Sequence, residues 1–331
     1  MIITRTPFRI SFFGGGTDYP DWYTNHGGSV LATTIDKYCY ISCRRLPPFF
    51  EHKHRIVYSR IENVASPRDI EHPAVRAVLT WANVVDGIEI HHDGDLPARS
   101  GLGSSSSFTV GLIHALYALR GQMASKEMLA QQAIEIEQNV IGENVGSQDQ
   151  VSASYGGFNR IDFSRSGSID VSPMVLHPER QRDLQSHLML CFTGISRIAS
   201  EVAKSKIANL NKRQDELKRM HRMVDEATNI LQGSGPIDEF GKLLDESWQY
   251  KRQLSDRVST PDIDDLYEAA RSAGATGGKL LGAGGGGFML LFARPERQEA
   301  VRNRLNRLVH VPFQFETAGS RVVLYQPHGF E

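Results

Sequence analysis

The sequence predicts an α+β fold of two domains, residues 1–180 and 181–331. Runs of alternating apolar residues, which are typical of strands, dominate the first third of the chain, and long helical patterns dominate the part after residue 200. A strand, a helix and two closing strands then complete the chain, an order that favours mixed layers of helix and sheet. With 331 residues, the chain is long enough to bury a sizeable core in two domains.

The first domain is expected to contain most of the strands. Alternating apolar residues predict strands at 2–4, 8–13, 30–44, 55–58, 88–92 and 158–162. A helix is expected from about residue 106 to 120, with Phe108, Leu112 and Leu116 on one face and Gly121 as its C-terminal stop. A second helix is expected from about residue 125 to 141.

The second domain is expected to be richer in helix. A strand is predicted at 188–193, and helices follow at about 200–231, 237–253 and 261–273. The last elements are a strand at 288–292, a helix at about 296–308, and strands at 312–316 and 321–325. The sequence contains no internal repeat and no low-complexity linker.

A loop of glycines and serines, residues 100–107, leads directly into the first helix. The first turn of a helix has unpaired amides, and glycine lets an oxyanion such as phosphate approach the backbone closely. A Walker loop would end in Gly-Lys-Ser/Thr, whereas Ser104 and Ser105 follow Gly103 here, so a P-loop fold is disfavoured. A simple glycine turn before a helix is the alternative.

Two further segments are rich in glycine. Residues 282–287 precede the strand at 288–292, and such a run indicates a backbone that comes very near another group. Packing against a neighbouring loop is the alternative. Near the N-terminus, the strand that carries Arg9 ends in a glycine turn, residues 14–16, which presents Asp18.

These three segments, in this order, resemble the GHMP small-molecule kinases, a family that includes galactokinases, homoserine kinases and mevalonate kinases. Residues 96–106 are similar to the family's Pro-x-x-x-Gly-Leu-Gly-Ser-Ser loop, and residues 279–287 to its Gly-Ala-Gly-Gly-Gly-Gly loop. The resemblance implies an N-terminal ribosomal-protein-S5-like α/β domain, a C-terminal ferredoxin-like α+β domain with helical insertions, and ATP bound between them.

Within the family, residues 8–20 are most similar to bacterial D-glycero-D-manno-heptose 7-phosphate kinases, with a more distant likeness to fucokinases. This likeness implies transfer of the γ-phosphate of ATP to the anomeric hydroxyl of the heptose 7-phosphate, for the synthesis of nucleotide-heptose and surface glycans. Galactokinases carry Glu-His where this chain has Gly15-Gly16, so galactose is not expected. An anomeric kinase for another sugar and a non-catalytic sugar-binding regulator stay open as alternatives.

The resemblance also implies residues for ATP and Mg²⁺. Mg²⁺ is expected at Ser105 and Glu137, since the ion usually takes one or two protein oxygens. Glu137 shares an apolar helical face with Ala130, Ile134 and Ile141, where a carboxylate is costly to bury without a partner. A half-exposed or arginine-paired Glu137 is the alternative. The residues expected to bind ATP are Gly101, Leu102, Gly103, Ser104, Ser105, Ser106, Gly284 and Gly285.

Asp149 lies in a glycine-flanked segment that we interpret as a loop, and the resemblance implies that it is the catalytic base. Arg9 corresponds to the family's lysine or arginine beside the base. A cation there keeps the aspartate ionised and partly neutralises the transferring phosphoryl group. An ordinary turn residue at 149 and a solvent-facing cation at 9 are the alternatives.

The acceptor is expected to contact Gly15, Gly16, Thr17 and Asp18, with sugar hydroxyls donating to Asp18. A phosphate on the acceptor would need cations, and Arg197 is favoured because it follows a strand in a Thr-Gly-x-Ser-Arg turn. The other candidates, which are usually solvated, are Arg44, Arg45, Lys53, His54 and Arg55. The basic helix at 204–222 is interpreted as structural.

Composition limits the expected partners. The net charge of −1 disfavours nucleic acid and membrane, so a small sugar phosphate is the expected partner, and a homodimer is left open. No run of about 18 apolar residues occurs and the N-terminus enters a strand, so a cytoplasmic location is expected. Cys39, Cys43 and Cys191 have no metal-ligand spacing and are interpreted as reduced core residues.

Overall fold

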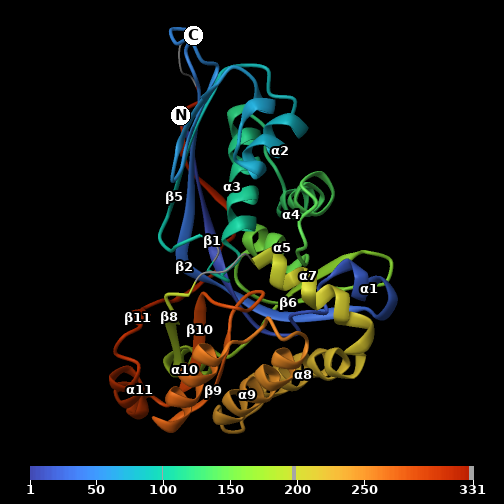
Figure 1. Cartoon of the computed structure of the whole chain (residues 1–331), viewed down its shortest axis with the longest axis vertical. Helices are drawn as coiled ribbons and strands as arrows, with labels where there is room; N and C mark the ends of the chain where they lie inside the picture. Colours follow the sequence, from blue (N-terminus) through green and yellow to red (C-terminus); the bar gives the residue numbers. More distant parts are fainter. Residues whose placement is uncertain (99, 196–198, 328–331) are drawn as a thin grey trace.

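The computed structural model describes residues 1–98, 100–195 and 199–327. Within this part of the chain, a nine-stranded sheet and a four-stranded sheet are each packed against helices. The large sheet extends toward the two chain ends at the top of Figure 1, and the small sheet lies at the opposite end among the C-terminal helices. The expected α+β composition is confirmed.

Two long antiparallel strands, β1 (Ile2–Phe13) and β2 (Gly28–Arg45), form the centre of the large sheet. The sequence predicts two strands where β1 is continuous. Pro7 lies at a shift in the register between β1 and β2, where a strand tolerates the missing proline amide, so β1 passes through it. The strand order is β13-β1-β2-β5-β3-β4, with β6 and β12 paired to the first half of β2 and β7 paired to β6.

The bounds of the other strands in this sheet are β3 (His54–Val57), β4 (Ile61–Val64), β5 (Ile88–Gly94), β6 (Phe158–Phe163), β7 (Ile169–Pro173), β12 (Phe315–Glu316) and β13 (Arg321–Tyr325). The strands β4 and β7 were not predicted. Each has only four or five residues, which is too short for a clear alternation of apolar and polar positions.

The helix α3 (Ser104–Leu119) packs on β1 and β2 and is buried over most of its length. A Cβ on Gly111 would lie 2.9 Å from Thr6 Oγ1, so glycine permits the close approach to the sheet. The Gly111 carbonyl also accepts a hydrogen bond from Thr4 Oγ1 (2.9 Å). The helix begins two residues earlier than predicted, so the serines at 104–106 form its first turn.

The other helices of this half differ from the prediction in three ways. The predicted helix at 125–141 is an α-helix, α4 (Lys126–Glu135), that continues as a π-helical segment, Ile136–Val140. Asp149 lies in the first turn of a helix, α5 (Gln148–Tyr155), and not in a loop. The helices α1 (Pro20–His26) and α2 (Pro73–Trp81) were not predicted, because they span only about two turns each.

The small sheet has the order β11-β8-β10-β9. Its strands are β8 (Leu188–Phe192), β9 (Ala275–Leu280), β10 (Phe288–Ala293) and β11 (Val309–Val311). The strand β9 was not predicted, since Gly277 and Gly278 lower its strand propensity. These glycines have a packing role, because a Cβ on Gly277 would lie 1.9 Å from the carbonyl oxygen of Gly241.

The helices of the second half are α6 (Pro178–His187), α7 (Ala199–Asn209), α8 (Gln214–Gln232), α9 (Asp238–Gln253), α10 (Pro261–Ser272) and α11 (Gln298–Arg304). Short 3₁₀ turns occur at Pro67–Asp69, Leu210–Lys212 and Pro295–Arg297. The single helix predicted at 200–231 is therefore two helices, α7 and α8. Asn209 and Asn211 lie at the break, and asparagine side chains compete with helical hydrogen bonds.

The end of the chain returns to the large sheet. The strand β12 pairs with β2, and β13 pairs with β1 beside the N-terminus. A division at residue 180 assigns both strands to the second domain, whereas their hydrogen bonds complete the first. Long-range pairing of this kind leaves no local signal in the sequence, so only the structure shows it.

One hydrophobic core joins the two sheets. Phe240 of α9 packs edge-on against Phe12 and Phe13 of β1 and also lies beside Phe292 of β10, with ring centroids 5.5, 5.1 and 6.2 Å apart. The cysteines are free and buried, as expected. None of the helices in the described residues has the length and apolar character needed to span a bilayer.

Candidate active site

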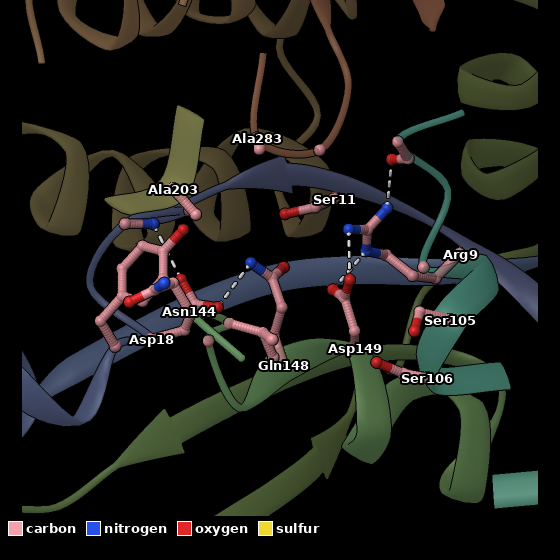
Figure 2. Close-up of a pocket in the computed structure, with 18 of the residues that line it drawn as sticks. Arg9, Ser11, Asp18, Ser105, Ser106, Asn144, Gln148, Asp149, Ala203 and Ala283 are labelled. Atoms are coloured by element: carbon pink, nitrogen blue, oxygen red, sulfur yellow. Dashed lines mark hydrogen bonds and ion pairs between the residues drawn. The ribbon is translucent and has the colours of Figure 1, made fainter. Parts of the chain in front are cut away.

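A cavity of about 250 Å³ lies where the large-sheet half and the C-terminal half meet. The strand β1, the first turns of α3 and α5, and the loop before α5 contribute polar groups to it (Figure 2). The C-terminal half contributes Gly282 and Ala283 of the second glycine loop and lysines from α7, α9 and β9. Most of the site residues expected in the first half therefore lie together, whereas the residues that the C-terminal half contributes are not the ones expected.

Arg9 and Asp149 form a two-pronged ion pair in this cavity. Arg9 Nε and Nη2 donate to Asp149 Oδ1 and Oδ2, each at 2.8 Å, and Arg9 Nη1 donates to the Gly101 carbonyl (2.7 Å). Arg9 is 4% exposed, which removes the alternative of a solvent-facing cation. One guanidinium thus ties the carboxylate of α5 to the loop that precedes α3 (Figure 2).

The two glycine loops contact each other through their backbones. A Cβ on Gly282 would lie 2.5 Å from Gly101 Cα, and one on Gly287 would lie 2.2 Å from the Ser100 oxygen. Gly101 (φ 85°) and Gly282 (φ 66°) also have left-handed backbones, which other residues adopt at a cost. Loop-to-loop packing, the alternative in the sequence analysis, therefore explains part of the glycine content.

The first glycine loop places the start of α3 at the cavity. Gly101, Gly103 and the serines 104–106 line it, and Gly103 precedes the helix with a left-handed backbone (φ 74°). Leu102, expected to bind ATP, is fully buried in the core, and its carbonyl accepts a hydrogen bond from the Arg9 amide (3.0 Å). Its role is to hold β1 against the loop.

Gly284 and Gly285 were also expected to bind ATP, but they do not line the cavity. The Gly285 amide donates to the Val258 carbonyl (2.9 Å), and a Cβ on Gly284 would lie 2.7 Å from the same oxygen. Both glycines therefore serve the packing of this loop. Gly282 and Ala283 face the cavity in their place.

Glu137 is almost fully buried at the cavity wall, with 1% exposure. Its Oε2 accepts hydrogen bonds from Ser106 Oγ (2.8 Å) and Gln150 Nε2 (2.5 Å), whereas its Oε1 has no partner among the described residues. Burial raises the pKa of Glu137 to about 7, although the neighbouring Thr109, Ser106 and Gln150 side chains oppose the shift. The hydroxyl bonded to Glu137 is that of Ser106; Ser105 is exposed on the same helical turn and also lines the cavity.

An unpaired carboxylate oxygen beside two serines is a donor set that suits Mg²⁺, which prefers hard oxygen ligands. The described residues contain no cluster of three or more His, Cys, Asp or Glu side chains that could hold a metal on its own. A Mg²⁺ ion here would thus depend on phosphate and water for its other ligands.

Asp18 lies at the opposite end of the cavity from α3 (Figure 2). Its Oδ1 accepts from the Gly16 amide (2.8 Å) and its Oδ2 from Gln148 Nε2 (2.9 Å), while burial raises its pKa. Gly15 and Gly16 line the cavity as expected. Thr17 does not; its hydroxyl donates to the Gly14 carbonyl (2.8 Å), so it stabilises the turn and does not reach the acceptor site.

Three lysines that the sequence analysis did not assign to the site also line the cavity: Lys206, Lys251 and Lys279. They are 5%, 5% and 2% exposed. Lys251 Nζ donates to the carbonyls of Leu280 and Gly282, and Lys279 Nζ to that of Phe12, all at 2.7 Å. Burial lowers the pKa of Lys206 to about 8 and that of Lys279 to about 7, and it lowers the pKa of Lys251 well below its usual value.

A sequence signal for Lys206 was present. Lys206 lies on the same helical face as Val202, Ala203 and Leu210, and a lysine on an apolar face is unusual. The interpretation of this basic stretch as a solvated structural helix is therefore wrong at Lys206. Ser11 and Gln148, which also line the cavity, had no comparable signal, because single polar residues are common in strands and helix first turns.

None of the other candidate cations for an acceptor phosphate, Arg44, Arg45, Lys53, His54 and Arg55, lines the cavity. Arg44 pairs with Glu89 on the large sheet, and Arg45 contacts Asp86. Arg197 lies outside the described residues.

Known proteins share both the sequence pattern and the fold. The family model for the N-terminal domain of GHMP kinases matches residues 70–157, and the model for the C-terminal domain of GHMP kinases matches residues 227–311. The chain is 30% identical over 309 residues to the D-glycero-alpha-D-manno-heptose 7-phosphate kinase of Campylobacter jejuni, with 90% of this chain and 91% of that protein aligned.

Two further similarities extend this comparison. The chain is 26% identical over 332 residues to the bifunctional fucokinase/GDP-fucose pyrophosphorylase of Arabidopsis thaliana, of which it spans 30%. Its fold is similar to the crystal structure of a D-glycero-D-manno-heptose 1-phosphate kinase from Bacteroides thetaiotaomicron, with a TM-score of 0.79, 23% identity, and 97% and 98% of the two chains covered.

Proposed function

The chain belongs to the GHMP kinase family, and we propose that it transfers the γ-phosphate of ATP to the anomeric hydroxyl of D-glycero-D-manno-heptose 7-phosphate, giving the 1,7-bisphosphate. It is a sugar kinase, a phosphotransferase that acts on a hydroxyl group, in a family that uses ATP as the phosphate donor. The observation that carries the proposal is the Arg9–Asp149 pair beside the N-terminus of α3 at the junction of the two halves.

The start of α3 is the proposed site of the ATP phosphates. The first turn of α3 lines the cavity, and the positive end of the helix dipole favours an anion there. Gly101 and Gly103 bring the backbone close, and Gly282 and Ala283 approach from the other half. Glu137 with Ser105 or Ser106 would hold Mg²⁺, which neutralises charge on the phosphates when it is bound.

Asp149 is the proposed base. It takes the proton from the acceptor hydroxyl as that oxygen attacks the γ-phosphorus, and the ADP oxygen leaves on the opposite side. The bidentate pair with Arg9 fixes the orientation of the carboxylate and supplies a positive charge beside the transferring group. Both carboxylate oxygens retain a lone pair for the acceptor while Arg9 is bound.

The acceptor would occupy the end of the cavity near Asp18. Ser11 Oγ and Gln148 Oε1 are buried and have no hydrogen-bond partner among the described residues, and both residues line the cavity. Buried polar atoms normally have partners, so these two atoms fit sugar hydroxyls. The alignment with the C. jejuni heptose 7-phosphate kinase over nearly the whole chain supports the heptose as the sugar.

A fucokinase-like activity on another sugar is the second candidate, and the similarity to the Arabidopsis fucokinase favours it. A panel of sugars and sugar phosphates assayed by coupled detection of ADP distinguishes the two. We expect the highest kcat/KM with heptose 7-phosphate, and a product whose new phosphorus resonance couples to the anomeric proton. Turnover with fucose but not with the heptose would show that fucose, and not heptose 7-phosphate, is the substrate. If no sugar gives ADP, the protein is not a kinase for these sugars, and a non-catalytic sugar-binding regulator is the alternative that remains.

A further inference from the structure

The cavity contains more buried cations than the proposed chemistry requires. Arg9 is matched by Asp149, but Lys206, Lys251 and Lys279 form no ion pair within 4.0 Å in the described part of the chain. Carboxylates line the same cavity, and the charges of Asp18 and Asp149 favour the charged form of Lys206. An ammonium group buried without a close ion pair is nevertheless costly, so three of them at one cavity favour an anionic ligand among them.

Lys206 is the lysine whose donors are available. Lys251 donates to two carbonyls and Lys279 to one, so part of their hydrogen-bonding capacity is used by the protein. Lys206 Nζ has no hydrogen bond among the described residues, and the contact found for it is with the face of the Tyr19 ring, 5.4 Å from the centroid. An ammonium group has three donors, which can all point to one phosphate.

The position of Lys206 separates it from the proposed ATP phosphates. Tyr19 follows Asp18, so the contact with its ring places Lys206 at the Asp18 end of the cavity. Figure 2 shows Ser105 and Ser106 at one end, Asp18 at the other, and Asp149 and Gln148 between them. An acceptor whose reacting hydroxyl lies at Asp149 and whose other hydroxyls reach Ser11 and Gln148 therefore extends toward Lys206.

We propose that Lys206 binds a phosphate group carried by the acceptor, and that Lys251 and Lys279 strengthen the positive potential around it. The inference rests on the proposed kinase function and deepens it. It assigns the enzyme to phosphorylated sugars and makes Lys206 a residue that determines specificity. Asp18 and Asp149 act on Lys206 through their charge, but neither forms an ion pair with it within 4.0 Å in the described part of the chain, so its three donors can point to a phosphate.

The test compares Lys206→Met with Lys204→Met, a matched change of an exposed lysine on the same helix. Calorimetric titrations of nucleotide-free protein use heptose 7-phosphate, the unphosphorylated heptose, inorganic phosphate and, separately, ATP. A charge-assisted hydrogen bond corresponds to a factor of about 10 to 100 in affinity. We expect Lys206→Met to weaken heptose 7-phosphate binding by that factor, and to weaken binding of the unphosphorylated heptose far less.

Several results would overturn the inference. If Lys206→Met lowers the affinity for the heptose and for its 7-phosphate equally, Lys206 is a general positioning residue. If it lowers the affinity for ATP alone, Lys206 binds the nucleotide. If Lys206→Met binds both the sugar phosphate and inorganic phosphate as tightly as the wild type does, Lys206 does not bind the phosphate. Lys206→Arg, which keeps the charge, should recover part of the affinity, and melting curves of all variants exclude misfolding as the cause.

The outcomes for the kinase and for Lys206 are separate. If wild-type protein forms no ADP with any acceptor, the proposed function fails, while calorimetry with inorganic phosphate still decides whether Lys206 binds an anion. If the wild type turns over an unphosphorylated sugar as efficiently as any sugar phosphate, the kinase stands and the inference about Lys206 fails.

Discussion

Asp149 owes its orientation to Arg9 as much as to its own helix, since two parallel hydrogen bonds from one guanidinium hold both of its oxygens. Glu137 shows the opposite arrangement, with one oxygen held by Ser106 and Gln150 and the other without a partner. At the residue scale, one carboxylate is thus held in place and the other keeps a coordination position open. These two features suit a base and a metal ligand.

Asp149→Asn should keep the shape of the side chain and remove the proton acceptor. A positioned base contributes about 10²- to 10⁴-fold to the rate, and loose phosphoryl-transfer transition states favour the lower end. We expect kcat to fall within this range while ATP still binds, as measured by steady-state kinetics and calorimetry. Arg9→Met should also lower kcat, and in the double variant with Asp149→Asn the two losses should be far from additive. Near-normal kcat in a folded Asp149→Asn protein would exclude Asp149 as the base.

Glu137→Gln should raise the Mg²⁺ concentration needed for half-maximal activity and lower kcat, because it removes a charged oxygen ligand. Titration of activity with Mg²⁺ at saturating ATP measures both. Glu135→Gln, on the exposed side of the same helix, is the matched control and should resemble the wild type. If Glu137→Gln keeps the wild-type metal dependence, this side chain has only a structural role. The same Mg²⁺ titration of Ser105→Ala and Ser106→Ala shows which serine hydroxyl contributes to metal binding.

Lys206 should make the stability of the free protein depend on pH. Burial lowers its pKa to about 8 from an ordinary value of 10.5, so the unfolded chain binds more protons between these pH values and stability rises with pH there. Lys206→Met should stabilise the protein by about 1–2 kcal/mol at pH 7, and the gain should shrink toward pH 10. Chemical denaturation at several pH values measures it. A loss of stability at pH 7, or the same gain in Lys204→Met, would contradict this account.

At the scale of elements, the two glycine loops act as one unit. A Cβ added to Gly282 would lie 2.5 Å from Gly101 Cα, and the Phe288 amide donates to the Ser100 carbonyl (3.0 Å). The start of α3 is therefore positioned by a loop of the other half of the chain. Such a contact couples the proposed ATP phosphate site to the packing between the two halves.

Gly282→Ala should disturb this contact, since its Cβ would lie 2.5 Å from Gly101 Cα. A displacement of about 1 Å in a catalytic site lowers rates up to about 100-fold, so we expect kcat/KM for ATP to fall about 10- to 100-fold. Gly167→Ala is the control, because Gly167 has a similar positive φ (86°) but no atom within 4 Å of the added Cβ. It should cost about 1 kcal/mol of stability and leave activity unchanged. Equal effects of the two changes would attribute both to backbone strain.

At the scale of the whole molecule, the core and the chain ends join the two halves. Phe240 connects β1 with β10, and β12 and β13 return from the C-terminal half to the large sheet. The candidate active-site cavity lies at this junction and has walls from both sides. The halves are therefore expected to unfold together.

Phe240→Ala should destabilise both halves by about 3–5 kcal/mol, because it leaves a cavity at their shared core. Trp22 and Trp248, which are buried in different halves, report on each when measured in variants that lack Trp81 and keep only one of the two. Both reporters should show the same transition at lower denaturant than in the parent protein. Phe50→Ala, at a side chain that is 49% exposed, should cause little change. Two separate transitions, only one of them shifted, would show that the halves unfold independently.

The sequence by itself determined the parts of this protein that depend on neighbouring residues. Glycine runs, a helix start rich in serine and the period of apolar residues predicted the α+β composition and α3, because each of these signals lies within one turn or one strand. The roles of Arg9, Glu137 and Asp149 came from the resemblance of short motifs to the GHMP kinases, and they stay predictions. Only the tertiary structure decided which distant segments meet. The strands β12 and β13 pair with the large sheet, and Gly284 and Gly285 do not line the cavity. Ser106, and not Ser105, donates a hydrogen bond to Glu137. Three elements bring lysines to one site: Lys206, Lys251 and Lys279. These outcomes depend on strand register and on contacts between the two halves of the chain, which no local pattern encodes.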